Sequence, residues 1–263
     1  MQRHFDTLLF SVLLPIYGKR EAGYIQSLML PELNDFTDKQ LAKVIVRLKT
    51  SEPWQYVLGK EWFYDLEFKV TAATLIPRPE TEELVFQILN NHKENSLQLL
   101  DIGTGSGCIP ISIQSERPEW EVSACDISEE ALKVAQENNV THETNVQFFQ
   151  EDILNPTENS KKWDIIVSNP PYIPMQEMEI MQKNVLDFEP HQALFVTNED
   201  PLVFYRKIGE FALTHLKSSG HLYFELNEFY AEKTQELIQG LGFKNVEITQ
   251  DLSEKNRMLK ASI

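Results

Sequence analysis

The sequence is poor in the residues that build metal centres and disulfide frameworks. It has 2 cysteines, Cys108 and Cys125, and 6 histidines that lie far apart along the chain. Neither set has the spacing of metal ligands, so we expect no bound metal. Both cysteines fall on predicted core elements, which indicates buried thiols in a reducing compartment.

Positive charge and long apolar runs are scarce as well. The 24 Lys and Arg residues are outnumbered by 40 Asp and Glu, which leaves a formal net charge of −16. Such a chain repels polyphosphates, so we expect no direct contact with nucleic acid. No apolar stretch reaches the length of about 18 residues that a membrane span needs, and no signal-peptide cleavage site follows the apolar residues 8–16. These absences favour a cytoplasmic protein without a membrane partner.

A glycine-rich turn follows an apolar strand predicted over residues 97–102. Glycines allow positive φ and a close approach of the backbone to a ligand, and the helix after the turn presents free N–H groups. The spacing Gly-x-Gly-x-Gly differs from the dinucleotide fingerprint, so the turn alone is a weak indication. It consists of Gly103, Thr104, Gly105, Ser106 and Gly107.

Acids end three successive predicted strands, at Asp101, Asp126 and Asp152. Asp126 lies about 20 residues beyond the glycine turn, where a ribose-binding carboxylate is expected. Each acid by itself is explained by a solvated loop or a helix N-cap, and for Asp152 alone we prefer that interpretation. As a series they predict a ligand site, because ligands collect at the carboxyl ends of parallel strands.

The next predicted strand, residues 164–168, runs into Asn169, Pro170, Pro171 and Tyr172. Two consecutive prolines stop a strand because neither can donate to a ladder and each restricts the residue before it. The Asn169 amide would then lie at the carboxyl end of the sheet, within reach of a substrate. This arrangement is typical of amino-methyltransferases. The alternative is a proline-terminated strand with an Asn in its turn.

The first part of the chain, residues 1–58, is predicted to be helical. Apolar segments over 5–17 and 21–33 indicate two helices, and a third opens at Thr37 with Gln40 in a capping box. We expect these helices to form a small domain that recognises a protein substrate.

The rest of the chain has the pattern of an α/β protein. Residues 59–78 are predicted to be a β-hairpin linker because the stretch 61–70 alternates in polarity. Strands alternate with helices over residues 79–263, and a helix over 128–139 is expected to have Ser128 as its N-cap. This alternation predicts a mainly parallel sheet with helices on both faces. The seven expected strands cover residues 97–102, 121–126, 146–150, 164–168, 220–226, 246–249 and 258–263.

Three segments carry a family resemblance. They are Thr-Leu-Ile-Pro-Arg-Pro-Glu-Thr-Glu-Glu-Leu-Val at 74–85, Gln-Tyr-Val-Leu-Gly at 55–59, and residues 164–173. Over essentially its whole length the chain resembles the HemK/PrmC family of protein-(glutamine-N(5)) methyltransferases, which act on peptide chain release factors. The resemblance implies a class I S-adenosylmethionine-dependent methyltransferase fold. This fold is a Rossmann-like seven-stranded sheet with an antiparallel last strand, here joined to a small N-terminal helical domain.

The resemblance also implies a reaction. The family transfers a methyl group from S-adenosylmethionine to the side-chain amide nitrogen of the glutamine in the Gly-Gly-Gln motif of class 1 release factors, which modulates translation termination. We expect the same activity of this chain, acting as a monomer. An amide nitrogen is a poor nucleophile because its lone pair is delocalised, so the site has to orient it rather than deprotonate it.

The site residues that the resemblance implies fall into two groups. The glycine turn would lie against the methionine part of the cofactor, Asp126 would take the ribose hydroxyls, and Asp152 with Ile153 would border the adenine. Asn169 would lie between cofactor and substrate. The implied catalytic residues are Asn169, Pro170 and Tyr172, and the same residues with Pro171 would bind the substrate.

Other positions of the resemblance lie outside the methyl-transfer motifs. Arg78 and Glu80 are expected to be structural or to position the substrate. The chain departs from the family pattern in its last third, where Ser219 replaces one of two usual glycines, Asn227 stands where a glycine usually follows the acid, and Asn256 replaces an Asp. These departures lie away from the methyl-transfer motifs, so they concern partner details rather than the reaction.

Two other functions share some of these features. A nucleic-acid amino-methyltransferase uses the same Asn-Pro-Pro-Tyr chemistry after base flipping, but the acidic balance and the absence of a basic target domain oppose it. A non-catalytic module that binds S-adenosylmethionine or holds translation factors is opposed by the intact Asp126, Asn169 and Tyr172.

Overall fold

The computed structural model describes residues 2–157 and 160–263. Three helices form the N-terminal part: α1 (Gln2–Glu32), α2 (Asp38–Lys49) and α3 (Trp54–Leu58). The two helices predicted over 5–17 and 21–33 are the two halves of α1, separated by a kink where Gly18 leaves helical geometry with a φ of 74° and a ψ of 170°. The predicted capping box is confirmed, because the Thr37 and Gln40 side chains each bond the other residue's backbone N–H at the start of α2.

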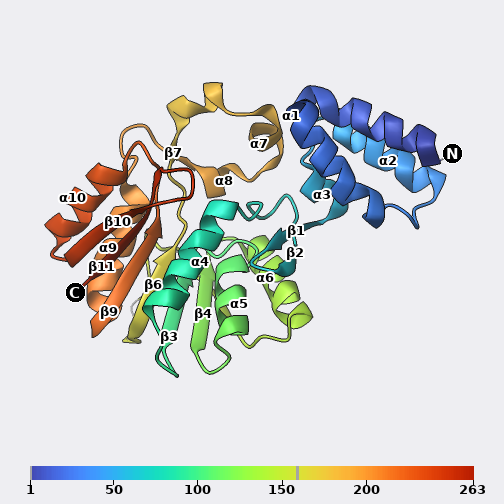
Figure 1. The fold of residues 1–263 in the computed structure, drawn as a ribbon. Coiled ribbons are helices and arrows are strands. Elements are labelled where there is room, and N and C mark those ends of the chain that lie inside the picture. The colour runs from blue at the N-terminus through green and yellow to red at the C-terminus, as the bar shows by residue number, and fades with distance from the viewer. Residues whose placement is uncertain (1, 158–159) are drawn as a thin grey trace.

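The N-terminal helices have a hydrophobic core of their own. Its fully buried members come from both halves of α1 and from α2, and Val57 of α3 completes it. They include Leu9, Leu13, Ala22, Met29 and Leu48. This core lets the helices pack as a unit beside the rest of the chain, as Figure 1 shows.

A two-stranded hairpin connects the helices to the sheet. Strands β1 (Lys60–Phe63) and β2 (Leu66–Lys69) are antiparallel, and Phe63 and Phe68 are buried in the core of the α/β part. Asn138 anchors the hairpin: its side-chain oxygen accepts from Lys69 N at 2.7 Å, and its Nδ2 donates to Lys69 O at 3.0 Å and to Ser106 O at 2.9 Å. One buried amide therefore binds the hairpin to the glycine turn.

The main sheet has the seven strands that the sequence predicts. Its order is β10-β11-β9-β6-β3-β4-β5, with parallel pairing from β9 across to β5. The last strand, β11, is antiparallel to both neighbours, as the resemblance implied. The strands are β3 (Gln98–Ile102), β4 (Glu121–Asp126), β5 (Gln147–Gln150), β6 (Trp163–Ser168), β9 (Leu216–Glu225), β10 (Lys244–Gln250) and β11 (Asn256–Ser262).

Helices cover both faces of this sheet. On one face α4 (Pro79–Asn91) and α5 (Cys108–Glu116) pack against side chains such as Leu99 and Ile165. On the other face α9 (Val203–His215) and α10 (Ala231–Leu241) pack against Leu100 and Ile166. Successive residues of one strand thus enter opposite cores, which is why these strands are apolar throughout rather than alternating. Helix α6 (Glu129–Thr141) begins at Ser128, whose side chain accepts from Ala131 N as the predicted N-cap.

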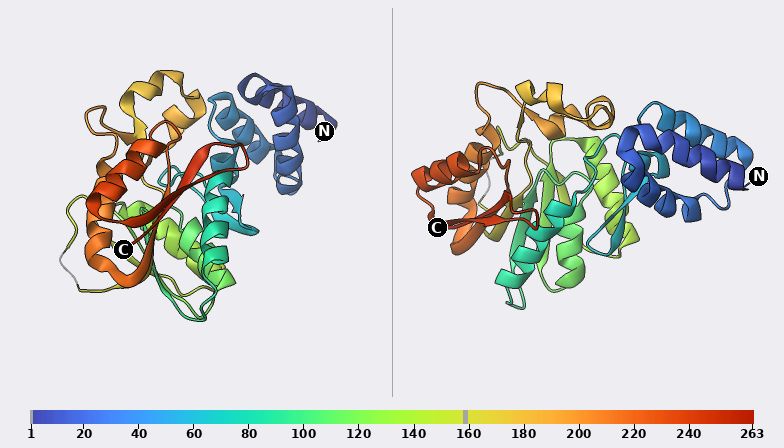
Figure 2. Two further views of the ribbon diagram at one scale, coloured as in Figure 1. Left: turned by 60° about the vertical axis from the view of Figure 1, so that its left-hand side comes forward. Right: turned by 45° about the horizontal axis from the view of Figure 1, so that its top comes forward.

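Residues 173–196 form an insertion between β6 and α9 for which the sequence predicted no elements. It lies next to the N-terminal helices, with α7 close to α1 (Figures 1 and 2). Its elements are β7 (Ile173–Pro174), the 3-10 helix η1 (Met175–Ile180), α7 (Lys183–Phe188), α8 (His191–Leu194) and β8 (Phe195–Val196).

In the part of the chain that the structure describes, no helix has the length and apolar character to cross a bilayer.

Gly107 offers a test of the packing around the glycine turn. Its φ is +81°, and a Cβ there would lie 2.9 Å from Ile111 Cδ1 and 3.1 Å from Ala135 Cβ. Gly107→Ala should therefore lower the free energy of unfolding by about 1–3 kcal/mol, measured by chemical denaturation. Gly240→Ala is the matched control: this glycine is in α10 with open space around it. The control should be neutral or gain up to about 1 kcal/mol, and an equal loss in both variants would contradict the packing argument.

Candidate active site

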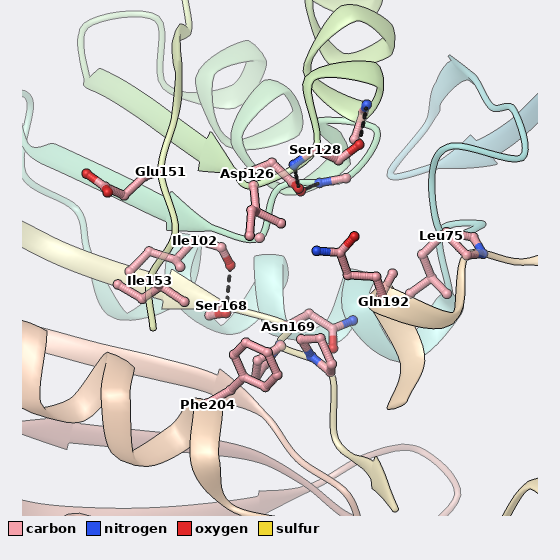
Figure 3. Close-up of a pocket in the computed structure, with 18 of the residues that line it drawn as sticks. Leu75, Ile102, Asp126, Ser128, Glu151, Ile153, Ser168, Asn169, Gln192 and Phe204 are labelled. Atoms are coloured by element: carbon pink, nitrogen blue, oxygen red, sulfur yellow. Dashed lines mark hydrogen bonds between the residues drawn. The ribbon is translucent and has the colours of Figure 1, made fainter. Parts of the chain in front are cut away.

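A pocket opens at the carboxyl ends of β3, β4 and β6 and just beyond β5. The glycine turn and the residues after β4, β5 and β6 form its floor and walls, and residues 73–75, the insertion and α9 complete it. In Figure 3, Gln192 of the insertion and Leu75 lie on one side of the pocket, and Glu151 and Ile153 lie on the other. This is the place in an open α/β sheet where ligands bind.

The glycine turn presents bare backbone to this pocket. Gly103 and Gly105 line it with φ values of +77° and +56°, and a Cβ at either position would point into open space. The N–H groups of Gly103 and Thr104 both donate to Cys125 O, at 2.9 and 3.0 Å, which fixes the turn on β4. The open space in front of the two glycines is the room that a closely bound ligand needs.

Three residues of the predicted turn do not line the pocket. Thr104 and Ser106 are buried, and Gly107 faces Ile111 and Ala135 of the neighbouring helices. Their contribution is to the shape of the turn, since the Gly107 N–H donates to Thr104 O at 2.9 Å and closes it.

Asp126 follows the turn on the pocket wall. Its Oδ2 accepts from Gly105 N and its Oδ1 from Ser128 N, both at 2.9 Å. Burial raises the pKa of this carboxyl, and the backbone N–H groups that it accepts lower the pKa in turn. Each oxygen has a further lone pair, so the carboxylate is held in place and can still accept from a pair of vicinal hydroxyls.

Asp152 and Ile153 also line the pocket, beyond the end of β5. Both Asp152 oxygens bond within its own loop, accepting from Leu154 N and from Asn155 Nδ2 at 2.9 Å. These bonds match the loop-acid interpretation of Asp152 taken alone, and they leave Ile153 as an apolar wall. Ile153 can therefore border a flat aromatic ligand beside a carboxylate that its own loop holds in place.

Asn169 stands where β6 ends, at the pocket edge, and Pro170 and Pro171 line the wall beside it. Its Nδ2 donates to Thr81 Oγ1 at 3.2 Å, and Thr81 Oγ1 donates to Glu225 Oε2 at 2.6 Å. Within the residues that the structure covers, no group donates to Asn169 Oδ1. The amide oxygen is thus available to a ligand while the amide nitrogen is engaged.

Tyr172 does not line the pocket. Its hydroxyl donates to Glu225 Oε1 at 3.0 Å, and its backbone carbonyl accepts from Asn227 Nδ2 at 3.1 Å. Burial raises the pKa of the Tyr172 hydroxyl well above its usual value, so the group stays protonated. In this structure the tyrosine therefore supports the Asn-Pro-Pro turn from behind.

No sequence pattern predicted a role for Thr81 or Glu225, although both are joined to Asn169 by hydrogen bonds in series. Thr81 belongs to the Ile-Pro-Arg-Pro-Glu-Thr-Glu segment, and Glu225 is an acid that interrupts the apolar run 222–226. The interrupted run was the available signal, because a charged residue inside a buried strand needs partners. The partner of Glu225 lies 144 residues away on α4, which no local pattern indicates.

Asp101 is fully buried beneath the turn. Neither of its carboxyl oxygens makes a hydrogen bond of normal geometry to another described residue. Burial raises the pKa of Asp101 to about 7, the nearby Thr104 hydroxyl lowers it, and the charge of Asp126 raises it further. Of the three acids at strand ends, only Asp126 and Asp152 reach the pocket.

Arg78 has a structural partner. Its Nη2 donates to Glu189 Oε1 at 2.5 Å, and Glu189 Oε2 accepts from Ile76 N at 3.2 Å. An ion pair thus joins the loop before α4 to the insertion, with the Glu189 carboxylate buried and the Arg78 guanidinium partly exposed. This agrees with the expectation that Arg78 is structural or positions the substrate.

Asp126 provides a test of cofactor binding at this pocket. If Asp126 accepts from the ribose hydroxyls of S-adenosylmethionine, Asp126→Ala should lower the affinity for this cofactor by roughly 1.5–3 kcal/mol, or about ten- to a hundredfold, by calorimetry. Asp38→Ala, at an exposed position of α2, removes the same charge far from the pocket and should leave the affinity unchanged. An unaltered affinity in a folded Asp126→Ala variant would show that the carboxylate has another role.

Known proteins with similar structures support the fold. The chain resembles a methyltransferase from Pyrococcus furiosus, with a TM-score of 0.56 and 18% identity over 75% of this chain and 90% of that one. It also resembles the ribosomal protein L11 methylase from Lactobacillus delbrueckii subsp. bulgaricus, with a TM-score of 0.53 and 17% identity over 73% of this chain and 83% of that one. The fold is the class I S-adenosylmethionine-dependent methyltransferase fold.

Comparison of the sequence with known proteins identifies a narrower family than the fold does. Residues 80–191 match the family described as methyltransferase small domain. The chain is 45% identical to the release factor glutamine methyltransferase of Flavobacterium psychrophilum, over 85% of this chain and 80% of that one. For the enzymes so named from Bacteroides thetaiotaomicron and Bacillus subtilis, the identities are 43% and 40%, over 85% and 82% of this chain and 81% and 77% of theirs. Fold and relatives identify S-adenosylmethionine as the cofactor. With relatives this similar over most of its length, the chain belongs to the family of release factor glutamine methyltransferases.

Proposed function

We propose that this chain transfers a methyl group from S-adenosylmethionine to the side-chain amide nitrogen of the glutamine in the Gly-Gly-Gln motif of class 1 peptide chain release factors, and thereby modulates translation termination. The names of its relatives support release factor glutamine as the target. The observation that carries the proposal is the Asn169 amide, which stands at the edge of the pocket with its oxygen available and its nitrogen engaged.

The residues at the end of β6 suit an amide substrate. Asn169 Oδ1 and the Pro170 carbonyl can each accept one N–H of a glutamine side chain, which orients the nitrogen and stabilises the positive charge that develops on it. Pro170 and Pro171 hold the turn rigid because their φ angles are fixed. When bound, S-adenosylmethionine supplies the methyl group on a sulfonium. Tyr172 would act on the substrate indirectly, because its hydrogen bond to Glu225 holds the turn in place.

The cofactor would be held by the residues that the sequence predicted. Gly103 and Gly105 of the glycine turn would lie against the methionine part, with Thr104, Ser106 and Gly107 shaping the turn, and the Asp126 carboxylate would accept from the ribose hydroxyls. Asp152 and Ile153 would border the adenine, with Ile153 as the apolar surface and the Asp152 carboxylate held in place by its own loop.

The release factor would also contact the N-terminal helices. We propose that residues 1–58 are a substrate-recognition domain, that residues 59–78 link it to the rest, and that residues 79–263 are the methyltransferase domain. The separate core of the helices and the groove between α1 and α7 support this division.

The net charge of −16 favours a protein substrate over free nucleic acid. We propose that the enzyme acts as a cytoplasmic monomer.

Asn169→Ala tests the chemistry separately from binding. The variant should lower the turnover number by about two to three orders of magnitude, because it removes a preorganised acceptor from a closed site. Turnover is measured at saturating S-adenosylmethionine, and cofactor affinity is measured in parallel. Asn90→Ala, at an exposed position of α4, is the control and should turn over as the wild type does. Near-normal turnover in Asn169→Ala would mean that this residue only ends the strand.

The substrate is tested by mass spectrometry of a class 1 release factor after incubation with the enzyme and S-adenosylmethionine. We expect a gain of one methyl group on the Gly-Gly-Gln glutamine, and no gain when that glutamine is replaced by Glu. Bulk DNA and RNA serve as competing acceptors. Methyl transfer to nucleic acid alone would overturn the proposal in favour of an exocyclic amino-methyltransferase.

A further inference from the structure

We infer that Thr81 and Glu225 determine which way the Asn169 side-chain amide points, and that they are positioning residues for methyl transfer. This inference rests on the proposed function, in which Asn169 presents its oxygen to the substrate. The two ends of an Asn amide have nearly the same shape, so something other than packing has to decide which end faces the pocket.

The three residues come together from three elements. Thr81 is in the first turn of α4, Asn169 follows β6, and Glu225 is the last residue of β9. Thr81 and Glu225 are 3% and 2% exposed, so water does not replace their hydrogen bonds. The bonds run in series, from Asn169 Nδ2 to Thr81 Oγ1 at 3.2 Å and from Thr81 Oγ1 to Glu225 Oε2 at 2.6 Å.

The direction of each bond follows from the number of hydrogens. A threonine hydroxyl has one hydrogen, and a carboxylate has none. The Thr81 hydrogen therefore goes to Glu225, and only lone pairs of Oγ1 remain for Asn169. Asn169 must then turn its NH2 group toward Thr81, which directs Oδ1 the other way.

Tyr172 reinforces the arrangement from the other side of the carboxyl group. Its hydroxyl donates to Glu225 Oε1, so both oxygens of Glu225 accept from O–H donors. If Glu225 were protonated, its carboxyl group would carry a hydrogen of its own in addition to the two that Thr81 and Tyr172 donate to it. Burial raises the pKa of Glu225, and the hydrogen bonds from Thr81 and Tyr172 and the charge of Arg257 act against that shift.

The same reasoning predicts what an uncharged isostere does. In Glu225→Gln the new amide can donate to Thr81 Oγ1, which frees the Thr81 hydrogen to point at Asn169. Asn169 would then turn its oxygen toward Thr81 and its NH2 group toward the substrate. Two N–H donors would face each other where one donor and one acceptor are required, so the substrate amide would lose its alignment.

The experiment compares Thr81→Val, Thr81→Ser and Glu225→Gln with the wild type on a release factor. Thr81→Val keeps the shape and removes the hydroxyl, and Thr81→Ser keeps the hydroxyl. We expect Thr81→Val and Glu225→Gln to lower kcat by about ten- to a hundredfold, the usual effect of losing one buried hydrogen bond. KM for the release factor and Kd for S-adenosylmethionine should stay within about threefold of the wild type. Thr81→Ser should retain at least about a third of the wild-type kcat.

A second measurement reads the amide directly and needs no substrate. In nuclear magnetic resonance spectra of the wild type, one Nδ2 hydrogen of Asn169 should exchange slowly with solvent because Thr81 accepts it. Both hydrogens should exchange fast in Thr81→Val. The signals are assigned by their loss in Asn169→Ala.

The outcomes separate this inference from the proposed function. A wild type that leaves the release factor unmethylated overturns the proposed function, and the exchange measurement still decides the orientation of the amide. A wild type that methylates it, with Thr81→Val or Glu225→Gln equally active, overturns the inference alone. A loss in Thr81→Ser as large as in Thr81→Val does so too, since it points to packing. If Thr81→Val does not fold, Glu225→Gln decides the matter.

Discussion

The parallel pairing of β5, β4, β3, β6 and β9 is the constraint on which the site depends. Parallel strands end at the same edge of the sheet. Residues that follow different strands therefore meet at this edge, although they are far apart in the sequence. The pairing of Ile102 with Cys125 and with Ser168 places the glycine turn between Asp126 on one side and Asn169 on the other. Strands β4 and β6 flank β3, so a cofactor at Asp126 and a substrate at Asn169 can bind side by side.

The sequence predicted the parts of the structure that are determined by nearby residues. The seven strands, the capping box at Thr37 and the N-cap at Ser128 depend on periodicity or on spacings of three or four residues, and all were found. The insertion was not predicted because its elements are too short to show a period. Its position depends on remote contacts, such as the bond from Ile76 N to Glu189 across 113 residues.

The same distinction applies within the candidate site. Gly103, Asp126 and Asn169 could be identified from the sequence because each directly follows an apolar strand. Thr81 and Glu225 could not be given a role, since their meaning arises only when α4 packs beside the ends of β6 and β9. Tyr172 was placed against the substrate on its proximity to Asn169 in the chain, whereas in the fold its hydroxyl turns to Glu225. Side-chain direction after a proline-rich turn is a tertiary property that neighbours in the sequence do not determine.

The Asn138 amide links two parts of the molecule that are far apart in the sequence. Its oxygen accepts from Lys69, and its NH2 group donates to Lys69 and to Ser106, so one planar group spans the hairpin and the glycine turn. Asp would lose both donors, Gln would be one methylene too long, and Leu would leave three backbone groups without partners. The hairpin carries the N-terminal helices, and the glycine turn faces the cofactor. A displacement of the helices is therefore transmitted to the turn as a rigid-body movement rather than absorbed by a flexible joint.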